Sequence, residues 1–246
     1  MTQQERPDYH PPAKAERVTT GRAVRPRQAS TLIIVRRDKS EPEVLMGRRS
    51  PGHTFLPGKF VFPGGRVDRG DLSVRPHTEL RPEVEERLLK GCSPAQARGL
   101  GMAAIRETFE ETGLLIGRKV AAPMATRSKI WNEFSGYGVA PALDIMDYIG
   151  RAITPAFQPK RFDARFFMVE AEHIHGDLHD TSNASGELLE IHWLPIAEAK
   201  KLELQGITLL MLDEVQKRLT LATAKAAELP IPFYYFKGKS RMRDDH

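Results

Sequence analysis

The hydrophobic pattern of this 246-residue chain alternates short apolar runs with longer stretches of helical periodicity. The short runs predict strands over residues 31–35, 44–49, 59–62, 114–116, 161–169 and 186–195. Helical spacing and capping residues predict helices over residues 82–91, 93–98, 103–112, 196–201 and 207–227. The length suits one domain with extensions better than two full domains.

The stretch Ala103–Gly113, with the sequence AAIRETFEETG, carries the densest candidate chemistry. Glu107, Glu110 and Glu111 stand at positions i, i+3 and i+4, so a helix places their carboxylates on one face. Three neighbouring carboxylates repel one another, which raises at least one pKa unless a multivalent cation lies among them. The pattern therefore predicts a divalent-metal site. The opposite face suits packing against a sheet and contains Ile105, Phe109 and Thr112.

The segments Arg106–Leu114 and Phe62–Gly65 resemble the signature of the Nudix hydrolases, G-x5-E-x7-R-E-U-x-E-E-x-G-U, in which U is apolar. Thr108 departs from the signature because it replaces an apolar residue. Asp71 stands where the family has Glu, at the G-x5 distance from Gly65. The 34 residues 72–105 separate Asp71 from the arginine, where the family has seven, so the motif contains an insertion.

The resemblance implies a fold and a set of roles. The fold is α/β (α+β), a mixed β-sheet sandwiched between helices, here with a helical insertion in the Nudix box and a C-terminal helix. Glu107, Glu110 and Glu111 match ligands of Mg²⁺, for which Mn²⁺ can substitute, and the Gly65 carbonyl matches a further ligand. Gly64 lies in the same loop, where the absence of a Cβ lets the backbone approach a phosphate of the substrate.

The resemblance also implies residues that assist catalysis. Arg106 would pair with a helix carboxylate and fix its rotamer. Many Nudix enzymes place one more carboxylate in the loop before the late strand, as a metal ligand or a base. Glu187 is the candidate for that position and Glu190 is the reserve. The general base is therefore open between Glu107 and Glu187.

The predicted strand 161–169 suggests a phosphate-binding face. Arg161, Asp163 and Arg165 alternate with apolar residues and share one side of the strand. Two arginines directed into a cleft would suit a phosphate-rich ligand, so Arg161 and Arg165 are candidate substrate-binding residues. The alternative is that Arg165 forms a structural ion pair with Asp163.

A narrower resemblance links the chain to the coenzyme A and acyl-coenzyme A diphosphatase-like branch of the Nudix family. It rests on residues 55–68, on the lengthened box and on the sequence RFDARFF at 161–167. A separate coenzyme A signature has an arginine upstream of the glycine loop, and Thr54 occupies that place here.

The same patterns divide the chain into regions. Residues 1–29 are polar and predict a flexible basic arm. Residues 30–205 form the expected Nudix domain, with 69–101 as the insertion in the box. Residues 206–246 supply a C-terminal helix and an aromatic and basic tail that packs on the domain. Trp131 and Phe134 are expected to pack in the core or at an interface, with a substrate pocket as the alternative.

Composition narrows the class of protein. A net charge of +5 and a pI near 9.3 suit the attraction of anionic phosphates. Nucleic acid is not the expected main partner, because no zinc-finger, RRM or KH signature accompanies the basic residues. No apolar run approaches the length of a membrane span. A single cysteine, Cys92, and no recognisable export signal favour the cytoplasm.

These observations favour an enzyme that hydrolyses the diphosphate bond of a small, nucleotide-like substrate, with coenzyme A or an acyl-coenzyme A as one candidate. The alternative is a Nudix-fold regulator that binds a nucleotide or ADP-ribose without turnover. A homodimer is compatible with the aromatic tail.

Overall fold

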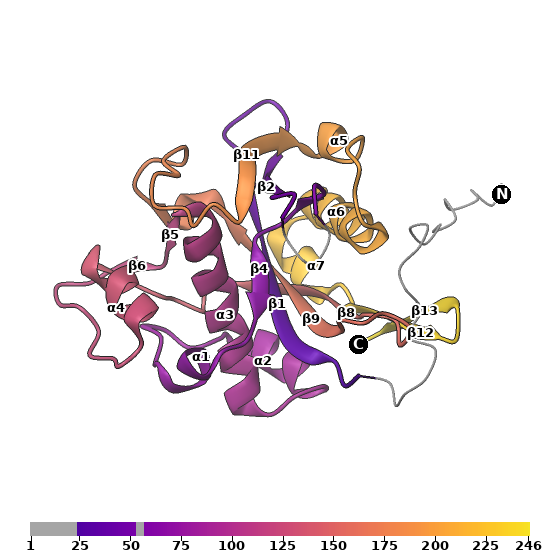
Figure 1. The fold of residues 1–246 in the computed structure, drawn as a ribbon, viewed down its shortest axis with the longest axis horizontal. Coiled ribbons are helices and arrows are strands. Elements are labelled where there is room, and N and C mark those ends of the chain that lie inside the picture. The colour runs from indigo at the N-terminus through magenta and orange to yellow at the C-terminus, as the bar shows by residue number, and fades with distance from the viewer. Residues whose placement is uncertain (1–23, 53–56) are drawn as a thin grey trace.

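The computed structural model describes residues 24–52 and 57–246, and it is built around one mixed sheet (Figure 1). Within the described residues the sheet has nine strands in the order β11-β2-β1-β9-β8-β12-β13, with β3 paired to β2 and β4 paired to β1. The strands are β1 (Arg27–Arg36), β2 (Glu43–Arg49), β3 (Phe60–Val61), β4 (Gly64–Arg66), β8 (Asp147–Ile153), β9 (Phe162–Glu170), β11 (Leu188–Pro195), β12 (Pro232–Lys237) and β13 (Ser240–Asp245).

Helices cover both faces of this sheet. They are α1 (Arg69–Ser73), α2 (Pro82–Leu89), α3 (Pro94–Thr112), α4 (Lys129–Gly136), α5 (Ile196–Ala199), α6 (Gly206–Leu219) and α7 (Thr223–Glu228). Two further sheets have two strands each. One pairs β5 (Leu115–Ile116) with β10 (Ile174–His175), and the other pairs β6 (Arg118–Lys119) with β7 (Val139–Ala140). The short 3₁₀ helix η1 (Ala171–His173) precedes β10.

Strand β1 shows how the core is divided. It is buried on both faces, and its side chains alternate between two apolar clusters. Leu32 and Ile34 join the cluster beneath α2, α3 and α4, whereas Ile33 and Val35 join the cluster beneath α6. The mixed sheet therefore lies between two helical layers, which confirms the fold class expected from the sequence.

Helix α3 is longer than the sequence pattern predicted. The segment 93–98 was expected to be a separate short helix, but Ser93 is the N-cap of one continuous helix that ends at Gly113, with φ of 79°. Gly99 and Gly101 lie inside the helix, at two points where other parts of the chain pack closely against its backbone. A Cβ on Gly99 would lie 2.5 Å from Leu72 Cδ2, and one on Gly101 would lie 3.1 Å from Leu143 Cδ2.

The insertion folds beside α3 and not away from the domain. Helix α1 contacts α3, and α2 packs on α3 through Val84 and Leu88. Trp131 and Phe134 of α4 are fully buried, and their rings pack edge to face with centroids 5.4 Å apart. These two aromatic residues therefore belong to the core and not to a substrate pocket.

The two ends of the described chain join the main sheet. Strand β1 begins at Arg27, so residues 27–29 of the expected flexible arm are strand, and residues 1–23 of that arm lie outside the described residues. The predicted helix 207–227 is divided into α6 and α7. Strand β12 pairs in parallel with β8 and forms a hairpin with β13, so the aromatic tail extends the sheet. No helix in the described ranges has the length and apolar character needed to cross a membrane.

Candidate active site

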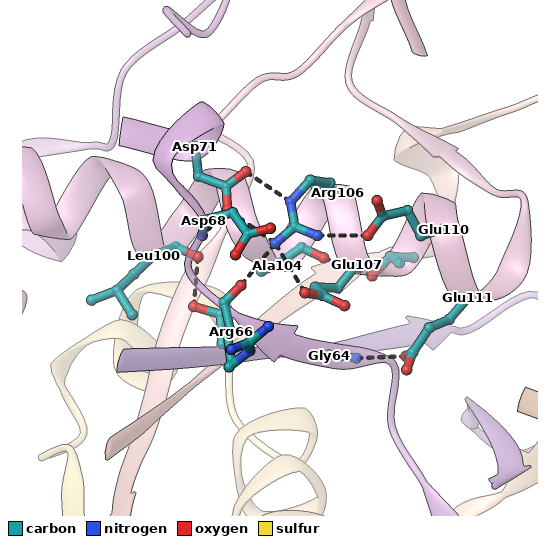
Figure 2. Close-up of polar contacts among 12 residues, drawn as sticks. Gly64, Arg66, Asp68, Asp71, Leu100, Ala104, Arg106, Glu107, Glu110 and Glu111 are labelled. Carbon is teal, nitrogen blue, oxygen red and sulfur yellow. Dashed lines mark hydrogen bonds and ion pairs between the residues drawn. The ribbon is translucent and has the colours of Figure 1, made fainter. Parts of the chain in front are cut away.

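The acidic face of α3 lies against the glycine loop that contains β4 (Figure 2). Glu111 Oε2 accepts a hydrogen bond of 2.8 Å from the backbone N–H of Gly64. The Glu107 carboxylate lies beside Gly65, where an added Cβ would be 2.4 Å from its Cδ and both of its oxygens. The backbone therefore approaches the Glu107 carboxylate as closely as only glycine permits.

Arg106 binds the surrounding carboxylates from the centre of the site. Its side chain is only 5% exposed, and it forms a two-point ion pair with Asp71, Nε to Oδ1 at 2.9 Å and Nη2 to Oδ2 at 3.0 Å. It also contacts Glu107 at 2.9 Å and Glu110 at 2.5 Å, and it donates to the Arg66 carbonyl. The guanidinium therefore fixes the carboxylates around it, as the sequence predicted.

Burial dominates the electrostatics of the three glutamates. It raises the pKa of Glu107 to about 7 and that of Glu111 to about 8, and it also raises the pKa of Glu110. Nearby guanidinium groups oppose the effect, Arg106 at Glu107 and Glu110, and Arg49 at Glu111. Mutual repulsion contributes as well, since Glu107 and Glu187 both raise the pKa of Glu111. Desolvated carboxylates of this kind gain stability from an added cation.

The structure divides the predicted carboxylate trio. Glu107, Glu111 and Glu187 line one cleft of about 720 Å³, together with Gly64 and Gly65. Glu110 instead turns toward Arg106 (Figure 2). It lines a separate hollow of about 370 Å³ with Asp68 and Asp71. In the part of the chain that the structure describes, no three His, Cys, Asp or Glu side chains are grouped as a ready metal site. The structure therefore does not place Glu110 with the other two, and its role as a ligand stays a prediction.

The residues of the cleft nevertheless fit a divalent metal ion. The available donors are carboxylate and backbone carbonyl oxygens, the ligand type that Mg²⁺ and Mn²⁺ prefer. The space that a Cβ on Gly65 would need is occupied by Glu107, so this carboxylate lies directly against the backbone of the glycine loop. Glu111 is only 1% exposed, and Arg49 Nη2 lies 3.7 Å from its Oε1. The donor set of Glu107, Glu111 and the glycine loop is therefore suited to a hard cation.

Of the two candidate substrate-binding arginines, only Arg161 reaches this cleft. Arg161 lines it and is oriented by hydrogen bonds to the carbonyls of Thr154 and Val24. Arg165 is 1% exposed, forms an ion pair with Asp163 and donates to the Gly91 carbonyl. The expectation that Arg165 points into the cleft is wrong, because strand alternation turns Phe162, Ala164 and Phe166 toward it.

Other residues were misplaced or missed by the sequence interpretation. Glu190, the reserve carboxylate, lies outside the cleft lining and pairs with Arg48 at the surface. Arg49 lines the cleft and lies 3.5 Å from the Gly64 carbonyl, but no motif indicated it. Asp71, in contrast, could be found from the sequence, because it stands at the G-x5 distance from Gly65. Thr54, the position that departs from the coenzyme A signature, lies outside the described residues.

Comparison with known proteins agrees with this geometry. A Nudix hydrolase from Alicyclobacillus acidocaldarius superimposes with a TM-score of 0.58 at 28% identity, covering 77% of this chain and 90% of that structure. The Caenorhabditis elegans protein named "Putative nudix hydrolase 7" is 26% identical over 68% of this chain. In both sequence and fold, the chain is therefore similar to Nudix hydrolases.

A further relative matches a shorter part of this chain. The Xenopus laevis protein named acyl-coenzyme A diphosphatase NUDT19 is 36% identical over 31% of this chain. The chain spans 51% of the length of the Caenorhabditis elegans relative and 26% of the Xenopus laevis relative. No family model matches the sequence.

Proposed function

We propose that this chain is a metal-dependent Nudix diphosphohydrolase, which uses water to cleave the diphosphate bond of a nucleotide-like substrate. The observation that carries the proposal is the position of Glu107 and Glu111. Both carboxylates are withdrawn from water, both have a raised pKa, and both face the glycine loop inside one cleft. Arg106 forms an ion pair with Glu107 and is itself held by Asp71.

Different residues of the cleft would bind the metal ion and the phosphate groups. Glu107 and Glu111, with the Gly65 carbonyl, would hold a divalent cation, Mg²⁺ or Mn²⁺. When bound, this ion supplies neutralising charge for the diphosphate and lowers the pKa of a water molecule. Arg49 lines the cleft beside Glu111 and adds positive charge for the phosphate oxygens.

A carboxylate must accept a proton as the water attacks. The water oxygen forms a new bond to one phosphorus, the bridging P–O bond breaks, and two phosphate monoesters result. Glu107 and Glu187 both line the cleft and are the two candidate acceptors.

The substrate proposed is a nucleoside diphosphate ester, with coenzyme A or an acyl-coenzyme A as the leading member. The similarity to the Xenopus laevis acyl-coenzyme A diphosphatase supports that choice, as does the resemblance carried by residues 55–68 and 161–167.

A substrate panel tests the proposal. The purified chain, with Mg²⁺ or with EDTA, is incubated with coenzyme A, acetyl-coenzyme A, ADP-ribose, NADH and diadenosine tetraphosphate, and the products are separated by chromatography. We expect Mg²⁺-dependent release of phosphate monoesters from at least one of them. Binding of any of these compounds without product would instead support the ligand-binding regulator. A panel that gives neither product nor binding would overturn both proposals.

A further inference from the structure

The cleft extends far beyond the acidic face of α3, across the sheet to the C-terminal hairpin. Its lining begins at Glu107 and Gly65 and reaches Phe236 and Arg241. We propose that its far part, here named the distal pocket, binds a terminal phosphate that the substrate carries at a distance from its diphosphate. The distal pocket is defined by Arg27, Lys160, Arg161, Tyr234, Phe236 and Arg241. This inference rests on the proposed hydrolase function.

A row of alanines forms the floor between the two parts of the cleft. Ala29 of β1, Ala164 of β9 and Ala152 of β8 lie in cross-strand register, so they share one face of the sheet. Arg66 of β4 continues the row at one end and Tyr234 of β12 at the other. All five residues line the cleft. Small side chains in the middle leave a trough that joins the glycine loop to the hairpin.

The length of this trough limits the ligand. Neighbouring strands lie about 4.8 Å apart, so the four steps from β4 to β12 span about 19 Å. An inorganic diphosphate is much shorter than this path. The trough therefore suits a diphosphate ester with an extended organic part that leaves the site in the direction of the hairpin.

Charge differs between the two ends. Glu107, Glu111 and Glu187 line the cleft near α3, where a cation would mediate contact with the diphosphate. Arg161, Lys160 and Arg241 line the distal pocket. Arg161 is held in place because its guanidinium donates to the Thr154 carbonyl at 3.0 Å and to the Val24 carbonyl at 2.7 Å. Basic groups that converge on one pocket favour a dianionic phosphate monoester.

The hairpin also gives the distal pocket an aromatic wall. Strand alternation directs Tyr234 and Phe236 to the same side of β12, and Tyr234 is only 8% exposed. Phe236 packs edge to face against Phe157, with centroids 6.4 Å apart, which supports the wall from outside. Such a wall suits a flat nucleobase. The ligand class is therefore a nucleoside diphosphate ester whose nucleoside carries an additional phosphate.

Matched substrate pairs test this assignment. Coenzyme A is compared with dephospho-coenzyme A, and NADPH with NADH, so that the members of each pair differ by one remote phosphate. We expect kcat/KM to favour the phosphorylated member of at least one pair by roughly tenfold, and Arg241→Gln to remove most of that preference through KM. Lys239→Gln is the matched control, since it removes a charge from the same hairpin outside the cleft lining.

A binding measurement keeps the test independent of turnover. Calorimetry with adenosine 3′,5′-bisphosphate and with adenosine 5′-monophosphate should show a preference for the bisphosphate that Arg241→Gln reduces and Lys239→Gln preserves. Ala164→Leu should weaken both the coenzyme A reaction and bisphosphate binding, because it fills the trough, whereas Ala156→Leu in the exposed loop should not.

The outcomes separate the two proposals. A binding preference that depends on Arg241 in a protein without hydrolase activity would retain the distal pocket and reject the proposed function. Hydrolysis with equal rates for both members of each pair, and no difference in binding, would overturn the distal pocket and retain the proposed function.

Discussion

Gly65 leaves the space that the Glu107 carboxylate occupies. A Cβ built on Gly65 would lie 2.4 Å from the carboxylate carbon and from both carboxylate oxygens, a separation that real Cβ atoms essentially never show. Glu107 is also fixed from the other side by Arg106, at 2.9 Å. The carboxylate therefore has little freedom to move aside without losing its ion pair.

The first prediction concerns this contact. Gly65→Ala should displace the Glu107 carboxylate and lower kcat/KM by about 100-fold, since a small misplacement of a catalytic group has an effect of that size. Gly136→Ala is the control, because Gly136 is exposed and has no atom within 4 Å of an added Cβ. Steady-state kinetics with Mg²⁺ on the two variants provide the comparison. Equal activity in both would show that the position of Glu107 beside the glycine loop does not matter for turnover.

The second prediction concerns Glu111. Glu111→Gln keeps the shape of the side chain and its hydrogen bond from Gly64 but removes the charge needed to hold a cation. We expect turnover to fall by about 100-fold or more, while the circular dichroism spectrum stays unchanged. Glu190→Gln, on the exposed surface, is the matched control. If Glu111→Gln retained full Mg²⁺-dependent activity, the assignment of Glu111 to the metal site would be wrong.

The local apolar pattern predicted β1, β2, β3, β5, β9 and β11, but it gave no signal for β8 or for the β12–β13 hairpin. The predicted strands 31–35 and 44–49 fall inside β1 and β2. The end of α3 was also predicted correctly, because Gly113 is a typical residue at a helix C-terminus. The continuous helix α3 was not predicted, because Gly99 and Gly101 resemble helix breakers unless their distant neighbours Leu72 and Leu143 are known.

Spacing along one helix predicted the acidic residues of α3, and the Nudix motif predicted the glycine loop, but neither predicted how the side chains pair. Glu107, Glu110 and Glu111 share a helix face, but Arg106 draws Glu110 away from Glu111, and i, i+3, i+4 spacing contains no information about that choice. Arg165 was assigned to the cleft for a similar reason. Its partner, the Gly91 carbonyl, lies 74 positions earlier in the chain, so its burial depends on the tertiary fold.

The third prediction concerns pH and stability in the metal-free protein. Burial raises the pKa of Glu111 from 4.5 to about 8 in the folded chain, so the unfolded chain releases this proton first. As pH rises from about 4.5 to 8, the unfolded state is favoured progressively and the free energy of unfolding falls. Below pH 4.5 the carboxyl is protonated in both states and imposes no penalty.

Urea unfolding in EDTA at pH 5, 6, 7 and 8 measures this effect. The free energy of unfolding of Glu111→Gln should decline less steeply with pH than that of the wild type, because its amide does not titrate. Glu83→Gln removes an exposed carboxylate and should keep the wild-type slope. Parallel slopes for the wild type and Glu111→Gln would contradict a raised pKa at this position.

The fourth prediction concerns the buried pair of Asp71 and Arg106. Asp71 is fully buried, binds Arg106 through both oxygens and lies 3.3 Å from Trp131 Nε1. Asp71→Asn leaves the guanidinium without its most buried counter-charge, so the free energy of unfolding should fall by about 3 kcal/mol. Urea unfolding at neutral pH measures the change.

A second ion pair on the same helix provides the control for Asp71→Asn. Arg98 of α3 pairs with Glu79 at 2.7 Å, but both side chains are exposed, so Glu79→Gln should change the free energy of unfolding by no more than about 0.5 kcal/mol. Asp71→Asn should also lower kcat, because Arg106 would then fix Glu107 less firmly. A variant with wild-type stability and kcat would show that the aspartate at the G-x5 position has no part in supporting the site, and that Arg106 is held by Glu107 and Glu110 alone.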